Sequence, residues 1–471
     1  MSVKVGLFGI GLDTYWGQFD GLLDRLKQYQ EFIGLKISLQ DITLINAGMV
    51  DNPEKARQAA EMLKREGVEL FFLYISTYAL SSTVLPVAQH LKVPFIILNL
   101  QPTPAINYDY INSLGDRGKM TGEWLANCQA CSVPEIASVF NRCDIFYDIV
   151  TGYLEETAAW EEIFAWTEAA KVASVMRSNR LGILGHYYNG MLDVYTDLTQ
   201  QCAVFGTHIE IVEMCELKNY RDEASKEEVD RKLEEFRQKF EVTKECESYE
   251  LERAARTSVA LDKLVSTHKL GSLAYYYEGS NGNDYENVVT SVIAGNTLLT
   301  GNHVPVAGEC EVKNAQAMKI MDAFGAGGSF SEFYAMDFND DIVMLGHDGP
   351  AHFSIAEGRV KLVPLPVYHG KPGKGLSIQM SVKYGPVTLL SVVQGKEGLF
   401  LLMAEGESVP GPVLNIGNTN SRYQFKIGAK EFINKWSKAG PAHHCAIGTG
   451  HMGIKIEKLG IILGIPVQKI C

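Results

Sequence analysis

The order in which short apolar runs and amphipathic segments follow each other constrains the fold more than any other feature of this sequence. Over the first 170 residues, runs rich in β-branched and aromatic residues alternate with segments of helical periodicity. The runs indicate strands at residues 3–8, 69–74 and 94–98, and the segments indicate helices at residues 21–30, 53–65 and 81–91. Such alternation predicts βαβ units on a parallel sheet, whose ligands lie beyond the carboxyl ends of the strands.

The alternation restarts near Asn179 and predicts a second α/β domain. Its strands fall at residues 181–184, 209–214 and 273–277. The charged stretch from Lys218 to about Leu264 carries acidic and basic residues at helical spacing, and we expect one or two solvated helices there. After Gly328 the chain changes to short alternating runs separated by glycine and proline, which predicts an antiparallel sandwich or barrel.

A chain of 471 residues is too long for one hydrophobic core, because single cores stop growing at roughly 250–300 residues. We therefore expect three domains: an α/β domain over residues 1–172, a second α/β domain over 173–326 and a mostly antiparallel, barrel-like β domain over 327–471. The net charge of −13 argues against a nucleic-acid partner, which needs a basic surface. Neither a secretory leader nor an apolar membrane span is recognisable, so a cytoplasmic protein without a membrane partner is expected.

Nine cysteines at scattered positions do not form the pattern of a disulfide framework, and we expect most of them to be reduced and buried. One tight pair, Cys128 and Cys131, has the spacing of half a zinc site or of a redox motif. No second pair completes it, which favours a purely structural role. The early glycines Gly6, Gly9 and Gly11 have the order GxxGxG and not that of the dinucleotide fingerprint, so a tight turn after the first strand is the simpler interpretation.

Four side chains that can bind a metal stand beside small residues at the ends of apolar runs, where a side chain can point into a cleft. They are Glu309 in Ala307-Gly308-Glu309, Glu332 in Gly327-Gly328-Ser-Phe-Ser-Glu332, His347 in Leu345-Gly346-His347 and His444 in Ala439-Gly440-Pro-Ala-His443-His444. Two carboxylates and two imidazoles suit Mn²⁺, Co²⁺ or Mg²⁺ and leave positions open for substrate oxygens. A metal held in this way polarises a carbonyl while a carboxylate moves a proton. No short motif forces the four together, so exposed carboxylates and core histidines stay open as the alternative.

At these residues the chain resembles the L-arabinose isomerase family. Members carry Ala-Gly-Glu, Gly-Gly-Thr-Ser-Phe-Met-Glu, Leu-Gly-Ser-His and Ala-Gly-Gly-Ala-His-His segments in the same order and at similar separations. The resemblance implies that Glu309, Glu332, His347 and His444 bind a divalent metal, Mn²⁺ in the first place, and that the two glutamates transfer protons between C1 and C2 of an aldose through an enediol. It also implies two α/β domains before a β-rich domain, and a homo-oligomer, a trimer or a hexamer, whose sites lie between subunits.

The same resemblance suggests five residues that contact the sugar. Met191 and Tyr277 correspond to a family methionine and a family aromatic residue at the substrate pocket, and His443 directly precedes the second histidine of the pair. Asp116 stands where the family has a histidine that reaches a neighbouring subunit's site, and the loop around Asp13 also differs from the family's Gly-Ser-Gln-x-Leu-Tyr-Gly. Because these two loops hold the far end of the sugar, the substrate stays open among L-arabinose-like pentoses and related tetroses or hexoses.

Two other functions compete with this interpretation. A non-catalytic sugar-binding protein of the isomerase fold would keep two α/β lobes around a cleft, but such a cleft has no need of two glutamates and two histidines. An NAD-linked oxidoreductase rests only on the early glycines. We therefore expect a metal-dependent aldose–ketose isomerase, and the sequence does not say which glutamate removes the proton.

Overall fold

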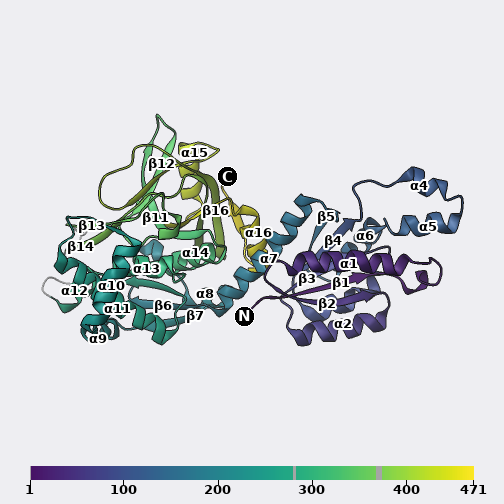
Figure 1. Cartoon of the computed structure of the whole chain (residues 1–471), viewed down its shortest axis with the longest axis horizontal. Coiled ribbons are helices and arrows are strands. Elements are labelled where there is room, and N and C mark those ends of the chain that lie inside the picture. Colours follow the sequence, from purple (N-terminus) through teal and green to yellow (C-terminus); the bar gives the residue numbers. More distant parts are fainter. Residues whose placement is uncertain (1, 279–282, 367–373) are drawn as a thin grey trace. The chain divides into compact units, whose positions relative to one another are not determined.

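The computed structural model describes residues 2–278, 283–366 and 374–471 (Figure 1). The chain divides into two compact units, Met1–Lys171 and Val172–Cys471. The expected division of the second unit at residues 326 and 327 stays a prediction. Among the described residues, no helix is both long enough and apolar enough to cross a membrane.

The first unit is built on a five-stranded parallel sheet with the order β2-β1-β3-β4-β5, as the alternating pattern predicts. The strands are β1 (Lys4–Ile10), β2 (Thr43–Val50), β3 (Leu70–Ile75), β4 (Phe95–Gln101) and β5 (Tyr147–Tyr153). All six residues of β3 are buried, because helices cover both faces of the sheet. The edge strands β2 and β5 were not predicted, since both are only partly buried and lack a long apolar run.

Helices on the two faces of this sheet form separate cores. Apolar residues of α2, α3 and α6 pack together with β1, β3 and β4, while α1 packs against β1 and β2 and contacts α7 through Phe32 and Trp160. The helices are α1 (Leu22–Ser38), α2 (Pro53–Glu66), α3 (Leu85–Leu91), α4 (Tyr108–Ser113), α5 (Arg117–Leu125), α6 (Val133–Arg142) and α7 (Thr157–Ser178). The limits of α2 follow from local signals: Asn52 caps its first turn by accepting the Lys55 amide, and Gly67 ends it in the left-handed conformation.

The structure corrects one expectation about cysteine. Cys128 and Cys131 form a disulfide, whereas the other seven cysteines are free, as expected. Of these seven, only Cys310 and Cys445 are fully buried, so the expectation that most cysteines are buried was wrong. Cys143 and Cys215 are exposed at the surface.

The second unit begins with a four-stranded parallel sheet of order β10-β9-β6-β7. The strands are β6 (Arg180–Gly185), β7 (His208–Val212), β9 (Ser272–Tyr276) and β10 (Val306–Ala307). Helices α8 (Leu198–Phe205), α9 (Met214–Asp222), α10 (Lys226–Lys239), α11 (Ser248–His268), α12 (Asp284–Val289) and α13 (Ile293–Gly301) lie between them in sequence. The expectation of solvated helices was wrong for α11, which packs against α9, α10 and α13 and buries even Glu250 and Arg253.

The last part of the chain forms a closed antiparallel barrel, which confirms the predicted barrel-like region. Six strands follow the order β15-β18-β11-β12-β17-β16, and β15 also pairs with β16, which closes the ring. They are β11 (Gly327–Asp337), β12 (Ile342–His347), β15 (Gly385–Gly395), β16 (Gly398–Val409), β17 (Thr419–Gln424) and β18 (His444–Thr449), and β19 (Val467–Lys469) extends β16. A separate sheet holds β8 (Glu241–Val242), β13 (Lys361–Leu365) and β14 (Gly375–Gln379). Helices α15 (Ala429–Lys438) and α16 (Gly453–Leu463) complete this part.

One helix joins the parallel sheet to the barrel. α14 (Val312–Ala323) is buried along nearly its whole length, including its polar residues. It contacts β9 and β10 of the parallel sheet as well as β11, β15 and β18 of the barrel. The carboxyl end of β10 is therefore held next to the barrel strands.

Replacing Leu73 by alanine in the fully buried strand β3 should lower the free energy of unfolding of the first unit by about 2–5 kcal/mol, because it leaves a cavity in the core. The same change at Leu39, which is 80% exposed, should alter it by less than about 0.5 kcal/mol. Urea unfolding followed by tryptophan fluorescence measures both, since four of the five tryptophans lie in this unit. Equal effects would contradict the assigned core.

Candidate functional site

Three of the four predicted metal-binding residues come from neighbouring strands of the barrel. Strand β11 lies between β18 and β12, and Glu332 on β11 is directly opposite His444 on one side and Gly346 on the other. His347 follows Gly346 as the last residue of β12. Directly opposite residues on antiparallel strands lie about 5 Å apart and share a face, so the register brings the side chains of Glu332 and His444 close, and it places the end of β12, with His347, beside them.

Glu309 reaches the same place from the parallel sheet, two residues beyond the end of β10. Its backbone is left-handed, with φ of 56°, and that of Cys310 is left-handed as well, with φ of 57°. This conformation costs residues other than glycine roughly 1–2 kcal/mol each, and it persists only where neighbouring structure enforces it. Here the Cys310 amide donates to the carbonyl oxygen of Tyr275 at 2.9 Å. The strained turn directs Glu309 toward the barrel.

The side chains of these residues converge. One potential ligand atom from each of Glu309, His347 and His444 lies within 4.8 Å of the others, and the same holds for Glu332, His443 and His444. The structure thus gathers the four residues singled out from the sequence, together with His443. All of them belong to the second unit.

His444 has the surroundings of a metal-binding imidazole. The ring is fully buried, and its Nδ1 lies 2.6 Å from Oε2 of Glu311, a carboxylate that is itself only 1% exposed. Nδ1 therefore carries the ring proton. Its Nε2 is buried, has no hydrogen-bond partner among the described residues, and lies 3.5 Å from the Glu309 carboxylate. A histidine that donates through one nitrogen to a carboxylate and presents the other nitrogen bare fits a divalent cation.

Phe330 fixes the orientation of both buried imidazoles. Its ring centroid lies 4.4 Å from that of His347 and 4.4 Å from that of His444. The Gly349 amide donates to Nδ1 of His347, and the His347 amide donates to Oγ1 of Thr419. The histidine rings are thus held by packing and by hydrogen bonds before any ligand binds.

His443 lies between two carboxylates. Its amide and its Nδ1 both donate to Oδ2 of Asp193, at 3.0 and 2.6 Å, and its Nε2 lies 3.3 Å from Oε2 of Glu309. Burial alone would lower the pKa of His443, but the bonds to Glu309 and Asp193 outweigh it and raise the pKa to about 9. His443 therefore carries a positive charge at neutral pH in the metal-free protein.

Glu332 has the properties of a carboxyl group that can carry a proton. It is half-buried, and burial raises its pKa above the ordinary value. The charges of His444 and His443 oppose this rise, whereas those of Glu309 and Asp348 add to it. A carboxyl group with a raised pKa can both accept and return a proton near neutral pH.

A cavity of about 280 Å³ opens beside these residues, close to the lower end of the usual size of small-molecule sites. Both Met191 and Tyr277 line it, as do Glu309, Glu332, His347 and His443. Three more tyrosines line it, with Tyr188 following β6 and Tyr275 and Tyr276 ending β9, and residues in and around α12 and α13 form another part of the wall. The cavity is therefore placed beyond the carboxyl ends of the strands, where the parallel sheet predicts a ligand.

The other two predicted sugar contacts, Asp13 and Asp116, lie in the first unit. Asp116 caps α5 by accepting the Lys119 amide at 2.8 Å, and Asp13 begins a short 3₁₀ turn, Asp13–Tyr15. Both side chains are exposed. Their contact with a sugar stays a prediction.

Sequence reasoning missed two residues that organise the site. Glu311 stands two positions after Glu309, but nothing in the sequence shows that it is buried against His444. Asp193 lies 250 positions before His443, so only the fold brings them together. Lys313, also buried, lies 3.4 Å from Glu311 and donates to the carbonyl oxygen of Asp193 at 2.6 Å. This lysine links the two residues.

Known proteins resemble this chain over a large part of its length. Residues 327–466 match the family described as the L-arabinose isomerase C-terminal domain. A sulfoquinovose isomerase of Alkalicoccus urumqiensis is 22% identical over 334 residues, which cover 69% of this chain and 72% of that protein. An L-arabinose isomerase of a Nocardioides species is 22% identical over 345 residues, which cover 70% of this chain and 67% of that protein. These matches confirm the predicted resemblance and the enzyme class, a sugar isomerase.

In the metal-free protein, Asp193→Asn should lower the pKa of His443 from about 9 toward the ordinary histidine value of about 6.5, because it removes one of two negative partners. The stability that this charge contributes is present below about pH 6.5 and is lost as the pH rises through about 9, so the variant should lose most stability on the acidic side. NMR titration of the imidazole measures the pKa. Asp230→Asn, on the exposed face of α10, is the control; an unchanged pKa in Asp193→Asn would contradict the assigned contact.

Proposed function

We propose that this chain, whose residues 327–466 belong to the L-arabinose isomerase C-terminal domain family, is a metal-dependent aldose–ketose isomerase that acts on a small sugar. The observation that carries the proposal is the convergence of Glu309, Glu332, His347 and His444 beside a cavity of suitable size.

Two carboxylates and two imidazoles would hold a divalent cation, and Mn²⁺, Co²⁺ and Mg²⁺ all accept such donors. When bound, the cation would supply a Lewis acid that polarises the sugar carbonyl. The buried Glu311 orients His444 for this role by holding the proton on Nδ1. Two residues outside the predicted four, Glu311 and Phe330, thus serve the cation indirectly.

The reaction moves one carbon-bound proton and one hydroxyl proton. One glutamate of the pair Glu309 and Glu332 takes the proton from C2 of the linear aldose, which gives an enediol, and the same proton returns to C1. The hydroxyl proton on O2 passes to O1, so the ketose has the composition of the aldose. The raised pKa of Glu332 supports its part in this transfer, and the positive charge of His443 stabilises negative charge on Glu309.

The cavity wall supports a small, hydroxyl-rich substrate. Aromatic rings of Tyr188, Tyr276 and Tyr277 and the side chain of Met191 line the cavity and would limit access of water to a bound sugar. The two relatives are named for different sugars, so their names do not select one. We extend the proposal to pentoses like L-arabinose and to related tetroses and hexoses, and to a homo-oligomer in which Asp13 and Asp116 of a neighbouring subunit meet the far end of the sugar.

Both Glu309→Gln and Glu332→Gln should lower turnover by at least about 10²-fold, because each removes a proton-transfer group. The assay is ketose formation from four- to six-carbon aldoses, with EDTA-treated protein before and after addition of Mn²⁺. Glu431→Gln, on the exposed side of α15, should keep wild-type activity. Near wild-type turnover in both site variants would show that the mechanism is wrong, and absence of both metal and turnover would favour a sugar-binding protein.

Glu311→Gln should weaken Mn²⁺ binding by about 10–100-fold while the fold is kept, because an amide no longer holds the His444 proton as firmly as a carboxylate. Calorimetric titration of EDTA-treated protein with Mn²⁺ measures this change without any assay of activity. Glu431→Gln serves again as the matched control. Unaltered affinity in Glu311→Gln would remove His444 from the set of ligands.

A further inference from the structure

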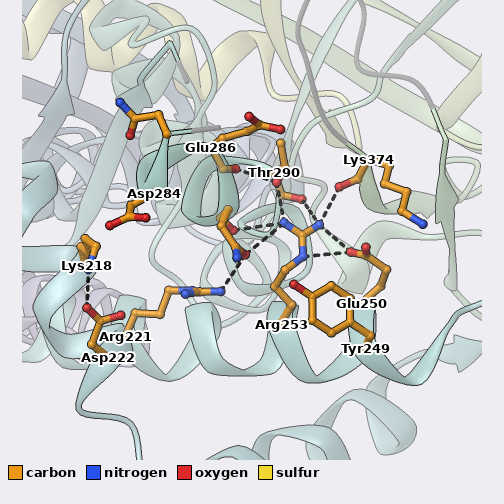
Figure 2. A pocket seen from close by; sticks show the side chains of 12 residues that line it. Lys218, Arg221, Asp222, Tyr249, Glu250, Arg253, Asp284, Glu286, Thr290 and Lys374 are labelled. Atoms are coloured by element: carbon orange, nitrogen blue, oxygen red, sulfur yellow. Dashed lines mark hydrogen bonds and ion pairs between the residues drawn. The ribbon is translucent and has the colours of Figure 1, made fainter. Parts of the chain in front are cut away.

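A second and larger cavity, of about 560 Å³, lies in the same unit (Figure 2). Helices α9, α11 and α12 form most of its wall, and Lys374, just before β14, completes it. Its lining is strongly polar and includes four cationic side chains and four carboxylates, namely Lys218, Arg221, Arg253, Lys374, Asp222, Glu250, Asp284 and Glu286. Neither the proposed reaction nor the family resemblance uses any of them.

Arg253 is fully engaged in holding the wall together. The guanidinium is buried and donates to the carboxylate of Glu250, to Oγ1 of Thr290 and to the carbonyl oxygens of Asn287 and Lys374. Figure 2 shows these bonds radiating from one side chain. Its charge is compensated by Glu250, so Arg253 has a structural role and is not itself the ligand-binding group.

Arg221 differs because its hydrogen bonds are to neutral oxygens. Nε donates to Oγ1 of Thr257 at 2.8 Å, and one Nη donates to Oδ1 of Asn287 at 2.9 Å. Within the described parts of the chain, no carboxylate lies within ion-pair distance of this guanidinium. These bonds fix the orientation of Arg221 but do not neutralise its positive charge.

A second guanidinium, that of Arg253, lies close to Arg221. The Asn287 oxygen that Arg221 contacts also accepts from Arg253, at 3.4 Å, so two guanidinium groups surround one amide. Burial lowers the pKa of Arg221 and the nearby charge of Arg253 lowers it further, whereas the charge of Asp222 opposes this. Of the other charges, Lys218 is paired with Asp222, and Asp284 is exposed at the rim. A guanidinium stays protonated under such conditions, so Arg221 keeps its positive charge and can bind an anion.

The second cavity adjoins the sugar cavity. Glu286 on α12 and Thr290, the residue that follows α12, line both cavities. Asn287, the partner of Arg221, also lies on α12. A ligand at Arg221 would therefore contact the helix that forms one wall of the proposed active site.

We propose that this second cavity binds an oxyanion, a sulfonate, phosphate or carboxylate group, through the guanidinium of Arg221. A planar guanidinium held by two fixed bonds suits the paired oxygens of such a group. The exposed carboxylate of Asp284 would accept hydrogen bonds from hydroxyl groups on the same ligand, which points to an acidic or esterified sugar or polyol. The oxyanion is either the charged end of the substrate itself or a separate small molecule bound beside it.

Sulfate and inorganic phosphate are the probes, titrated calorimetrically into the EDTA-treated full chain at low ionic strength. We expect binding to the wild type that Arg221→Gln weakens by at least about tenfold. Asn287→Asp should weaken it as much, because it places a carboxylate of nearly identical shape against Arg221. Arg231→Gln, which removes the same charge from the exposed face of α10, should bind like wild type.

Absence of sulfate and phosphate binding to the wild type, or undiminished binding in Asn287→Asp, would overturn the proposal, and this holds even if Arg221→Gln fails to fold. The source of the anion is tested by kinetics, and only that arm rests on the proposed isomerase activity. A rise in KM confined to anionic aldoses in Arg221→Gln would assign the oxyanion to the substrate, whereas unchanged discrimination between neutral and anionic aldoses would assign it to a separate ligand. Because the titration needs no turnover, a failure of the isomerase proposal is distinguished from a failure of this one.

Discussion

The pairing of β11 with β18 on one side and with β12 on the other is the constraint on which the candidate site depends. It sets Glu332 opposite His444 and beside the end of β12, where His347 lies. Phe330, two residues earlier on the same face of β11, packs against both imidazoles. A slip of one residue in this register would turn Glu332 and Phe330 to the other face together. The candidate site and the barrel core therefore depend on the same strand register.

The chain segment between β10 and the barrel connects the parallel sheet of the second unit to these barrel strands. A left-handed turn directs Glu309 toward the barrel, and Glu311, two residues later, accepts a hydrogen bond from His444. The buried helix α14 follows and packs against both the parallel sheet and the barrel. One short segment thus contributes a potential ligand, the carboxylate that orients another ligand, and the packing that keeps the two layers in place. Charged residues are tolerated in this buried segment because Glu311 is paired with both His444 and Lys313.

The sequence predicts those parts of the fold that leave a strong local pattern. The run Leu70–Ile75 is apolar throughout and was recognised as a strand, whereas β2 and β5 are half-exposed edge strands without such a run. The four acidic and imidazole residues were found through short segments that resemble a known family. Their convergence, the contact of Asp193 with His443, and the burial of α11 depend on distant parts of the chain meeting in space, which no local pattern records. The bond between Cys128 and Cys131 likewise was not predicted from their spacing.

The origin of the cavity wall has a consequence for how such a protein can change its substrate. The groups proposed for proton transfer and metal binding lie on barrel strands and on the strained turn after β10, where packing allows few substitutions. Met191, Tyr188 and Tyr277, which face the same cavity, lie in loops after parallel strands and are not part of the ladder. Mutation can therefore reshape the sugar-facing wall while the reactive groups stay in place, so one inherited chemistry can serve sugars of different length, stereochemistry or charge.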